Sequence, residues 1–305
     1  MRAPVTLRLR DRELALSSAA PLLMGVVNAS PESFSDGGLY QGVGAQVAQA
    51  EALVADGAGI IDVGGESGVT GMDPLAVDEE IRRVVPLVEQ LVDRGILVSV
   101  DTWKPPVARA ALAAGAHLIN DVSGLLDVGL ADACADGGAG LVLMHTRATP
   151  KQKEFPHYDD VVADLLGFLQ ERMDLALAHG VAPDGIVLDP GPDFAKTPAQ
   201  TIDALRALPA LVDLGRPVLL AVSRKDFVGA IVRRRPRDRL AGTLAAVGHG
   251  VDAGAHMLRV HDVGAVADYL AVRATLRGER PIAADVRVPE DLRREPLQQP
   301  PSPGT

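Results

Sequence analysis

The chain has 305 residues, a formal net charge of −10 and a single cysteine, Cys134. The acidic balance, without a basic stripe along any segment, argues against nucleic-acid binding, and one cysteine excludes both a disulfide framework and a cysteine-based zinc site. Hydrophobic residues make up 47% of the chain but aromatic residues only 3%, so we expect a core of Ala, Val, Leu and Ile, as in helices packed on parallel strands.

No apolar run reaches 18 residues, so the sequence predicts no membrane span. The opening residues, Met1 to Val5, lack the apolar stretch of a signal peptide. We therefore expect a soluble cytoplasmic protein.

The first predicted element is a small hairpin over residues 5–16, where apolar and polar side chains alternate. Eight short apolar runs follow, each rich in Val, Ile or Leu and each ending in polar residues. They are residues 22–29, 59–66, 97–102, 117–123, 140–146, 185–191, 217–224 and 257–263. Stretches with helical periodicity, such as 78–88, lie between them, which indicates right-handed βαβ units and a parallel sheet.

Eight such strands in one chain predict an α/β fold of the (β/α)8 barrel type, with the hairpin capping its lower mouth. An open doubly wound sheet is the alternative, but it would call for a glycine-rich phosphate loop after the first strand, which residues 28–38 do not provide. We assign residues 1–283 to the barrel. Residues 284–305, rich in Pro, Glu, Arg and Gln, are predicted to be a disordered tail.

A glycine-bearing turn of small residues precedes several of the strands, at Gly57, Gly115, Gly138 and Gly254. Glycine just past a helix can adopt the left-handed conformation that ends it. The repeat therefore predicts one kind of helix-to-strand joint, built several times.

In a (β/α)8 barrel the active site lies at the carboxyl ends of the strands, where this sequence places a set of polar residues. They are Asn28, Asp62, Glu66, Asp101, Asn120, Asp121, His145, Asp189, Ser223, Arg224, Lys225, Arg259, His261 and Asp262. Carboxylates and amides come from the earlier strands and cations from the last two. A ligand with a donor-rich neutral ring and an anionic tail would fit both halves.

Other interpretations of these residues stay open. Asp62 and Asp121 could cap the helices that follow them, and His145 could be a hydrogen-bonded core histidine. Lys225 beside Arg224 could act as a Schiff-base lysine. A metal hydrolase is disfavoured, because the histidines form no pairs of the kind such enzymes use.

Seven motifs fall in order along the chain: MGVVNASPESFSDGG, DVGGES, VSVDTWKP, LINDVSG, LDPG, SRKD and RVHDV. Together they resemble the dihydropteroate synthase family, over roughly residues 22–280. The resemblance implies a pterin-binding (β/α)8 barrel. It also implies an enzyme that joins 4-aminobenzoate to 6-hydroxymethyl-7,8-dihydropterin diphosphate with Mg2+ present, releasing 7,8-dihydropteroate and diphosphate.

The resemblance also implies roles for individual residues. The pterin pocket would contain Asp101, Asn120, Val122, Met144, Asp189, Phe194 and Lys225. The diphosphate would be held by Asn28, Arg259 and His261, with Asn28 also near Mg2+, and these three and Lys225 would be the catalytic residues. The aminobenzoate site would contain Pro31, Phe34 and Ser223. A homodimer is implied as well.

The sequence departs from the family pattern at three places, of which one is Trp103, a large residue for its place after Asp-Thr. Gly68, Val69 and Thr70 stand where the family usually reads Thr-Arg-Pro, and loss of a charge-assisted arginine contact would remove about 1.5–3 kcal/mol. In the motif after residue 189, Pro192 and Asp193 replace an expected aromatic residue and glycine. Asp193 would either add negative charge near the ring or point to solvent.

These departures leave two alternatives to the synthase. One is a diverged pterin-binding paralogue with weak or no synthase activity. The other is a methyltransferase that binds methyltetrahydrofolate, but such an enzyme has no need of a diphosphate site.

Overall fold

The computed structural model describes residues 4–29, 42–66, 71 and 73–294. Eight of its strands form one parallel sheet in the order β8-β7-β6-β5-β4-β3-β10-β9. Their bounds are β3 (Leu22–Asn28), β4 (Ile60–Gly64), β5 (Val98–Asp101), β6 (Leu118–Asp121), β7 (Gly140–Met144), β8 (Ile186–Asp189), β9 (Leu219–Leu220) and β10 (Met257–Val260). Each predicted apolar run contains one of these strands.

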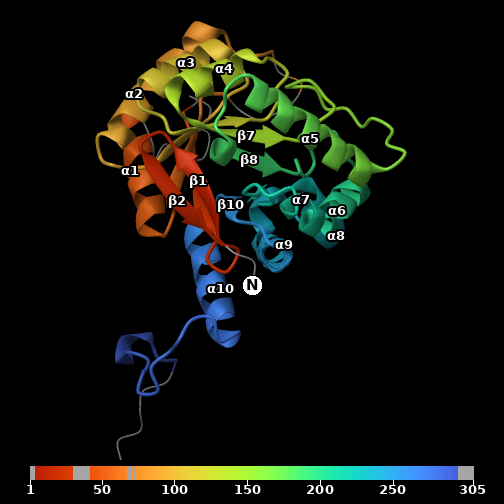
Figure 1. The fold of residues 1–305 in the computed structure, drawn as a ribbon. Helices are drawn as coiled ribbons and strands as arrows, with labels where there is room; N and C mark the ends of the chain where they lie inside the picture. Colours follow the sequence, from red (N-terminus) through yellow and green to blue (C-terminus); the bar gives the residue numbers. More distant parts are fainter. Residues whose placement is uncertain (1–3, 30–41, 67–70, 72, 295–305) are drawn as a thin grey trace, which may run out of the picture.

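The two ends of the sheet meet, so the sheet curls into a barrel (Figure 1). Leu188 of β8 forms a parallel bridge with Val218, and its backbone N–H donates to the carbonyl of Pro217 at 2.9 Å. The (β/α)8 barrel is confirmed, and the open doubly wound sheet is excluded.

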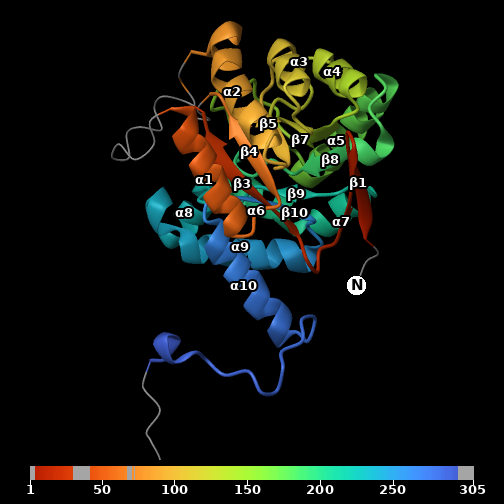
Figure 2. The same ribbon diagram turned by 90° about the vertical axis from the view of Figure 1, so that its left-hand side faces the viewer.

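Helices surround the strands (Figures 1 and 2). They are α1 (Val43–Ala55), α2 (Val77–Val92), α3 (Pro105–Ala113), α4 (Gly129–Gly137), α5 (Val161–Ala178), α6 (Pro198–Arg206), α7 (Leu208–Val212), α8 (Asp226–Val232), α9 (Leu240–Ala253) and α10 (Val263–Leu276), with 3-10 turns η2 (Pro183–Gly185), η3 (Pro236–Asp238) and η4 (Glu290–Leu292). The main core is aliphatic and lies between helices and strands. In α2, Val84, Leu87 and Val88 are buried, as the helical spacing of residues 78–88 predicts, and Leu91 continues the buried face.

The hairpin of β1 (Val5–Leu9) and β2 (Arg12–Leu16) closes the lower mouth of the barrel, as predicted. Leu7, Leu9 and Leu16 are buried in a second apolar cluster. Its other members come from seven barrel strands: Met24, Ile60, Leu118, Val142, Val187, Leu219 and Met257. The hairpin therefore seals the end of the barrel opposite the carboxyl ends of the strands.

The repeated joint between helix and strand is also confirmed. Gly138 (φ +61°) ends α4 and Gly254 (φ +105°) ends α9, both in the left-handed conformation. A side chain with Cβ would be strained at these angles. Each turn brings the chain directly into the next strand.

After α10 the chain leaves the barrel, and residues 281–294 lie apart from it (Figures 1 and 2). Residues 284–294 are almost all exposed and contain the short turn η4. The disorder predicted for residues 284–305 stays a prediction. Within the described part of the chain, no helix is long and apolar enough to cross a membrane.

Candidate active site

The sheet register brings predicted site residues together at the carboxyl ends of the strands. Asp101 of β5 lies beside Asn120 of β6, and Met144 of β7 lies beside Asp189 of β8. Because all eight strands run parallel, these side chains meet at one mouth of the barrel.

Arg259 of β10 reaches two carboxylates inside this mouth. Its Nε donates to Asp62 Oδ2 at 2.6 Å, and one terminal nitrogen donates to Asp101 Oδ2 at 2.9 Å. Asn120 Nδ2 donates to the same Asp62 oxygen at 3.1 Å. Charge-assisted bonds of this kind fix the plane of a guanidinium group, so these partners orient Arg259.

One interpretation of the sequence was that Asp62 caps the helix after its strand. The contact with Arg259 shows instead that Asp62 is a partner of that residue. It is fully buried, and α2 begins with no side-chain cap. Asp121 does not cap a helix either, since its carboxylate accepts from the N–H groups of Ser123 and Leu125 in the turn after β6. The sequence names Asp62 as a strand-end residue but gives no sign of its contact with Arg259.

Burial shapes the ionisation of the carboxylates. It raises the pKa of Asp101; the Asp62 carboxylate adds to this, and Arg259 opposes it. Burial also raises the pKa of Asp189. The backbone N–H of Gly191, which donates to Asp189 Oδ1 at 2.7 Å, lowers this pKa and so offsets part of the effect. Both groups therefore take up protons more readily than exposed aspartates.

A cavity of about 390 Å³ opens between these strand ends and the loops above them, and Asp101, Val122, Phe194 and Lys225 are among its lining residues. The Lys225 ammonium lies 4.3 Å from the centre of the Phe194 ring, a cation–π distance. Burial lowers the pKa of Lys225. Met144 is buried at the end of β7. The cavity thus combines charged and apolar groups.

A second cavity of about 370 Å³ lies next to the first, since both are lined by Arg224 and Lys225. It also contains Arg259, Ser223 and His261. Loss of solvation, together with Arg259 and Arg224, lowers the pKa of His261, so its ring is neutral at neutral pH.

Ser223 holds the His261 ring in place. Its Oγ accepts from the His261 backbone N–H at 3.2 Å and lies 3.0 Å from Nδ1. If the hydroxyl proton goes to Nδ1, Nε2 carries the ring proton and becomes a hydrogen-bond donor. Arg224 forms two bonds to the Asp262 carboxylate, at 2.6 and 3.1 Å, which partly offsets its charge.

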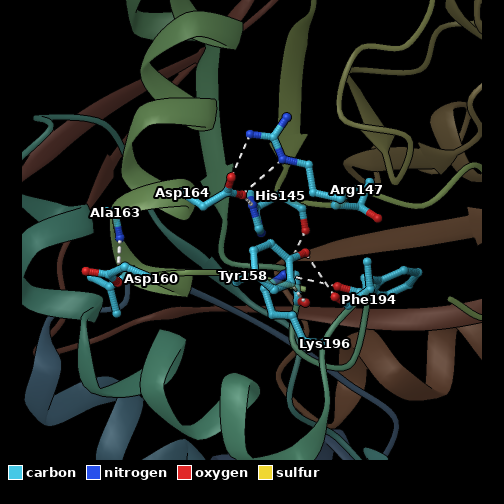
Figure 3. Close-up of polar contacts among 12 residues, drawn as sticks. His145, Arg147, Tyr158, Asp160, Ala163, Asp164, Phe194 and Lys196 are labelled. Carbon is cyan, nitrogen blue, oxygen red and sulfur yellow. Dashed lines mark hydrogen bonds and ion pairs between the residues drawn. The ribbon is translucent and has the colours of Figure 1, made fainter. Parts of the chain in front are cut away.

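His145 is fully buried, and its ring contacts Asp164 of α5 (Figure 3). Its Nε2 lies 2.8 Å from Asp164 Oδ1, and Asp164 also takes two bonds from Arg147. Burial lowers the pKa of His145 to about 3, so the ring is neutral. The geometry favours the core interpretation over a ligand contact.

The buried Lys196, which sequence reasoning missed, braces the loop after β8 (Figure 3). Its ammonium donates to the carbonyls of His145 (3.1 Å), Gly191 (3.0 Å) and Phe194 (3.1 Å). A lysine in the otherwise apolar stretch Phe194 to Lys196 was the available signal. This brace fixes the backbone that carries Phe194.

A second buried ionic group supports the wall near β4. Glu66 bonds to Lys104 at 2.9 Å and to Lys151 at 3.0 Å, and Lys104 also bonds to Glu80 at 2.7 Å. The Lys104 ammonium lies 4.9 Å from the Trp103 ring centre, and Trp103 lines the first cavity. These contacts explain how a tryptophan is held at this position.

Pro31 and Phe34 lie outside the described residues, as do Gly68, Val69 and Thr70. Asn28 ends β3, where it is exposed.

A family model described as "Pterin binding enzyme" matches residues 24–261. This match covers most of the chain and includes the strand-end residues of the site from Asn28 to His261. The chain therefore belongs to the pterin-binding enzyme family.

Similar proteins indicate which group within this family the chain belongs to. The dihydropteroate synthase of Synechocystis sp. is 39% identical over 258 residues, covering 83% of this chain and 89% of that protein. A solved structure of Xanthomonas albilineans dihydropteroate synthase with 4-aminobenzoic acid has a TM-score of 0.83 at 42% identity, covering 90% of this chain and 99% of the other. Another, in complex with 7,8-dihydropteroate, has a TM-score of 0.79 at 43% identity and covers 88% and 98%. Within its family the chain belongs with the dihydropteroate synthases.

Proposed function

We propose that the protein is a dihydropteroate synthase, which condenses 4-aminobenzoate with 6-hydroxymethyl-7,8-dihydropterin diphosphate. The observation that carries the proposal is the pair of adjoining cavities. One holds carboxylates and Phe194, and the other holds Arg259 and His261. A donor-rich ring joined to an anionic tail matches this division, and the solved relatives bind 4-aminobenzoic acid and 7,8-dihydropteroate.

The pterin ring would bind at the bottom of the first cavity. The Asp189 carboxylate can accept two parallel hydrogen bonds, from a ring N–H and from the exocyclic amine. Asp101, Asn120 and Lys225 would contact other polar atoms of the ring, while the apolar side chains pack on its faces. These are Val122, Met144 and Phe194.

The diphosphate would bind in the second cavity. Arg259 uses Nε and one terminal nitrogen for Asp62 and Asp101, and its other terminal nitrogen carries two further donors. Nε2–H of His261 adds a neutral donor. The resemblance assigns the neighbouring aminobenzoate site to Ser223 with Pro31 and Phe34.

Mg2+ fits this arrangement only together with the substrate. The described residues contain no group of three or more His, Cys, Asp and Glu side chains that could hold a metal ion. Asn28 offers one hard oxygen ligand, and Mg2+ commonly takes its other ligands from substrate phosphates and water. We propose that Asn28 holds Mg2+, which would offset the negative charge of the diphosphate.

The reaction would be a displacement at the methylene carbon of the pterin. The bond from this carbon to the diphosphate oxygen breaks, the ring stabilises the positive charge, and the aminobenzoate nitrogen forms the new bond and loses a proton to water. Arg259, His261 and Asn28 would stabilise the negative charge of the leaving diphosphate, and Lys225 would contact the pterin ring. The pocket contributes orientation of the two reactants.

A homodimer and a cytoplasmic location remain proposals. An apolar groove between α6, α8 and α9 supports the dimer, because Ile231 and Val232 are exposed there. Sedimentation of the purified protein would measure the oligomeric state, and Ile231→Asp should favour the monomer if this groove is the contact.

Diphosphate release by the purified protein tests the proposed function. The substrates are the dihydropterin diphosphate and 4-aminobenzoate with Mg2+, and a reaction without aminobenzoate is the control. Release that depends on aminobenzoate is the expected result. No release, together with measurable pterin binding, would overturn it in favour of the diverged paralogue.

A further inference from the structure

Asp193 joins two loops of the pterin pocket. It lies in the loop after β8, and its carboxylate accepts hydrogen bonds from the backbone N–H groups of Asp226 and Phe227. These are the first two residues of α8, whose N-cap residue, Lys225, provides no side-chain cap. Asp193 thus supplies, from another loop, the acceptor that the start of a helix needs.

The backbone at Asp193 is held in an unusual conformation. Its φ is +67°, a left-handed value that glycine adopts freely and Asp tolerates better than most residues. Thr201 of α6, fully buried, accepts from the Asp193 N–H at 3.1 Å, and Lys196 bonds to carbonyls on both sides. The family resemblance places glycine at this position, a residue that adopts such a φ without strain, and Asp193 adds a carboxylate.

The two joined loops carry two residues that line the first cavity and contact each other there. Phe194 follows Asp193 directly, and Lys225 precedes Asp226 directly. The Lys225 ammonium lies 4.3 Å from the centre of the Phe194 ring. Any change in the spacing of the loops would change this contact, since each partner is one residue from the joint.

We propose that Asp193 is a positioning residue of the pterin pocket: by joining the loop after β8 to the first turn of α8, it fixes Lys225 against Phe194. The identity of the ligand rests on the proposed function. The hydrogen bonds between Asp193 and α8 do not depend on it. The sequence allowed two positions for the Asp193 side chain, either near the pterin ring or in solvent. The carboxylate points instead to the start of α8.

The Asp193 charge also provides a readout that a purely structural contact would lack. The charged groups that act most on Lys225 are Asp193, Asp189, Asp101 and Arg259, and Lys196 and His261 also interact electrostatically with it. Burial lowers the pKa of Lys225, and Asp193 is the foremost of the charges that oppose this. Removing its charge should therefore move the loss of pterin binding at alkaline pH to lower pH.

The test compares Asp193→Gly and Asp193→Asn with the wild-type chain. Glycine retains the left-handed backbone without a carboxylate, and asparagine retains the shape without the charge. Asp159→Gly and Asp159→Asn are matched controls, since the Asp159 side chain is fully exposed in the loop before α5. The measurements are calorimetric binding of 6-hydroxymethyl-7,8-dihydropterin diphosphate across pH, and amide hydrogen exchange at Asp226 and Phe227.

We expect Asp193→Gly to weaken pterin binding about tenfold, as loss of a charge-assisted contact would, and to speed exchange at both amides. Asp193→Asn should shift the alkaline limit of binding downwards. Wild-type affinity and exchange in both variants would overturn the proposal, as would a lower Tm with an unmoved pH limit. If Asp193→Gly does not fold, Asp193→Asn decides. If the wild-type chain binds no pterin, the proposed function fails, and hydrogen exchange still tests the joint.

Discussion

At the scale of single residues, the proposed pterin pocket depends most on the carboxylate of Asp189. Asp189→Ala removes two charge-assisted hydrogen bonds to the ring, each worth about 1.5–3 kcal/mol. Pterin affinity should therefore fall at least about 100-fold. Titration calorimetry with the dihydropterin diphosphate would measure this, with Asp159→Ala as the control. Unchanged affinity would refute the assignment of the ring to β8.

The pH dependence of pterin binding follows from the same residues. Asp189 must be ionised to accept both bonds, and burial raises its pKa above the usual 3.8, so affinity is lost as pH falls through that raised value. Lys225 must be protonated to donate, and burial lowers its pKa below the usual 10.5, so affinity is also lost as pH rises through the lowered value. Pterin affinity measured from pH 4 to 11 should follow a bell-shaped curve. The curve should be narrower than one set by an aspartate and a lysine with their usual pKa values. A flat profile over this range would contradict both assignments.

At the scale of elements, the hairpin of β1 and β2 contributes stability rather than chemistry. Leu9 is fully buried against the lower ends of the barrel strands, so Leu9→Ala should lower the free energy of unfolding by about 2–5 kcal/mol. Urea unfolding would measure the change. Leu14→Ala is the matched control on β2, since Leu14 is only partly buried and should cost less.

Pterin affinity of folded Leu9→Ala should stay that of the wild type. The hairpin and the candidate site lie at opposite ends of the barrel, so a cavity under the hairpin leaves the upper loops in place. A loss of affinity as large as the loss of stability would mean that the hairpin also shapes the site.

At the scale of the whole molecule, the site draws on residues from nearly every strand of a closed barrel, so ligand binding should stabilise the fold. Dihydropterin diphosphate at 100 times its dissociation constant adds about 2.7 kcal/mol to the free energy of unfolding. For a chain of this size the midpoint of thermal unfolding should rise by about 4–6 °C. Thermal unfolding at fixed protein concentration measures the shift. If the Asp189→Ala variant showed an equal rise in unfolding midpoint at the same ligand concentration, the ligand would be stabilising the protein through a site other than the proposed pterin pocket.

The sequence by itself determined the architecture. Apolar runs with polar ends marked the eight strands, alternation marked the hairpin, and glycines such as Gly138 marked the ends of helices. These features follow from local physics: side-chain periodicity and backbone conformation are set by near neighbours along the chain. Strand-end residues such as Asp189 and Lys225 were identifiable for the same reason, because the fold fixes where strand ends go.

Only the tertiary structure decided which strand-end residues meet. Asp62 and Arg259 are 197 residues apart in the chain, and Asp193 and Asp226 are 33 apart, so no local pattern records either contact. Strand β3 pairs with both β4 and β10, which brings Asp62 and Arg259 to the same mouth, and packing of α8 brings its first turn to the loop after β8. The orientation of Arg259 and the joint that holds Lys225 are therefore properties of the closed barrel.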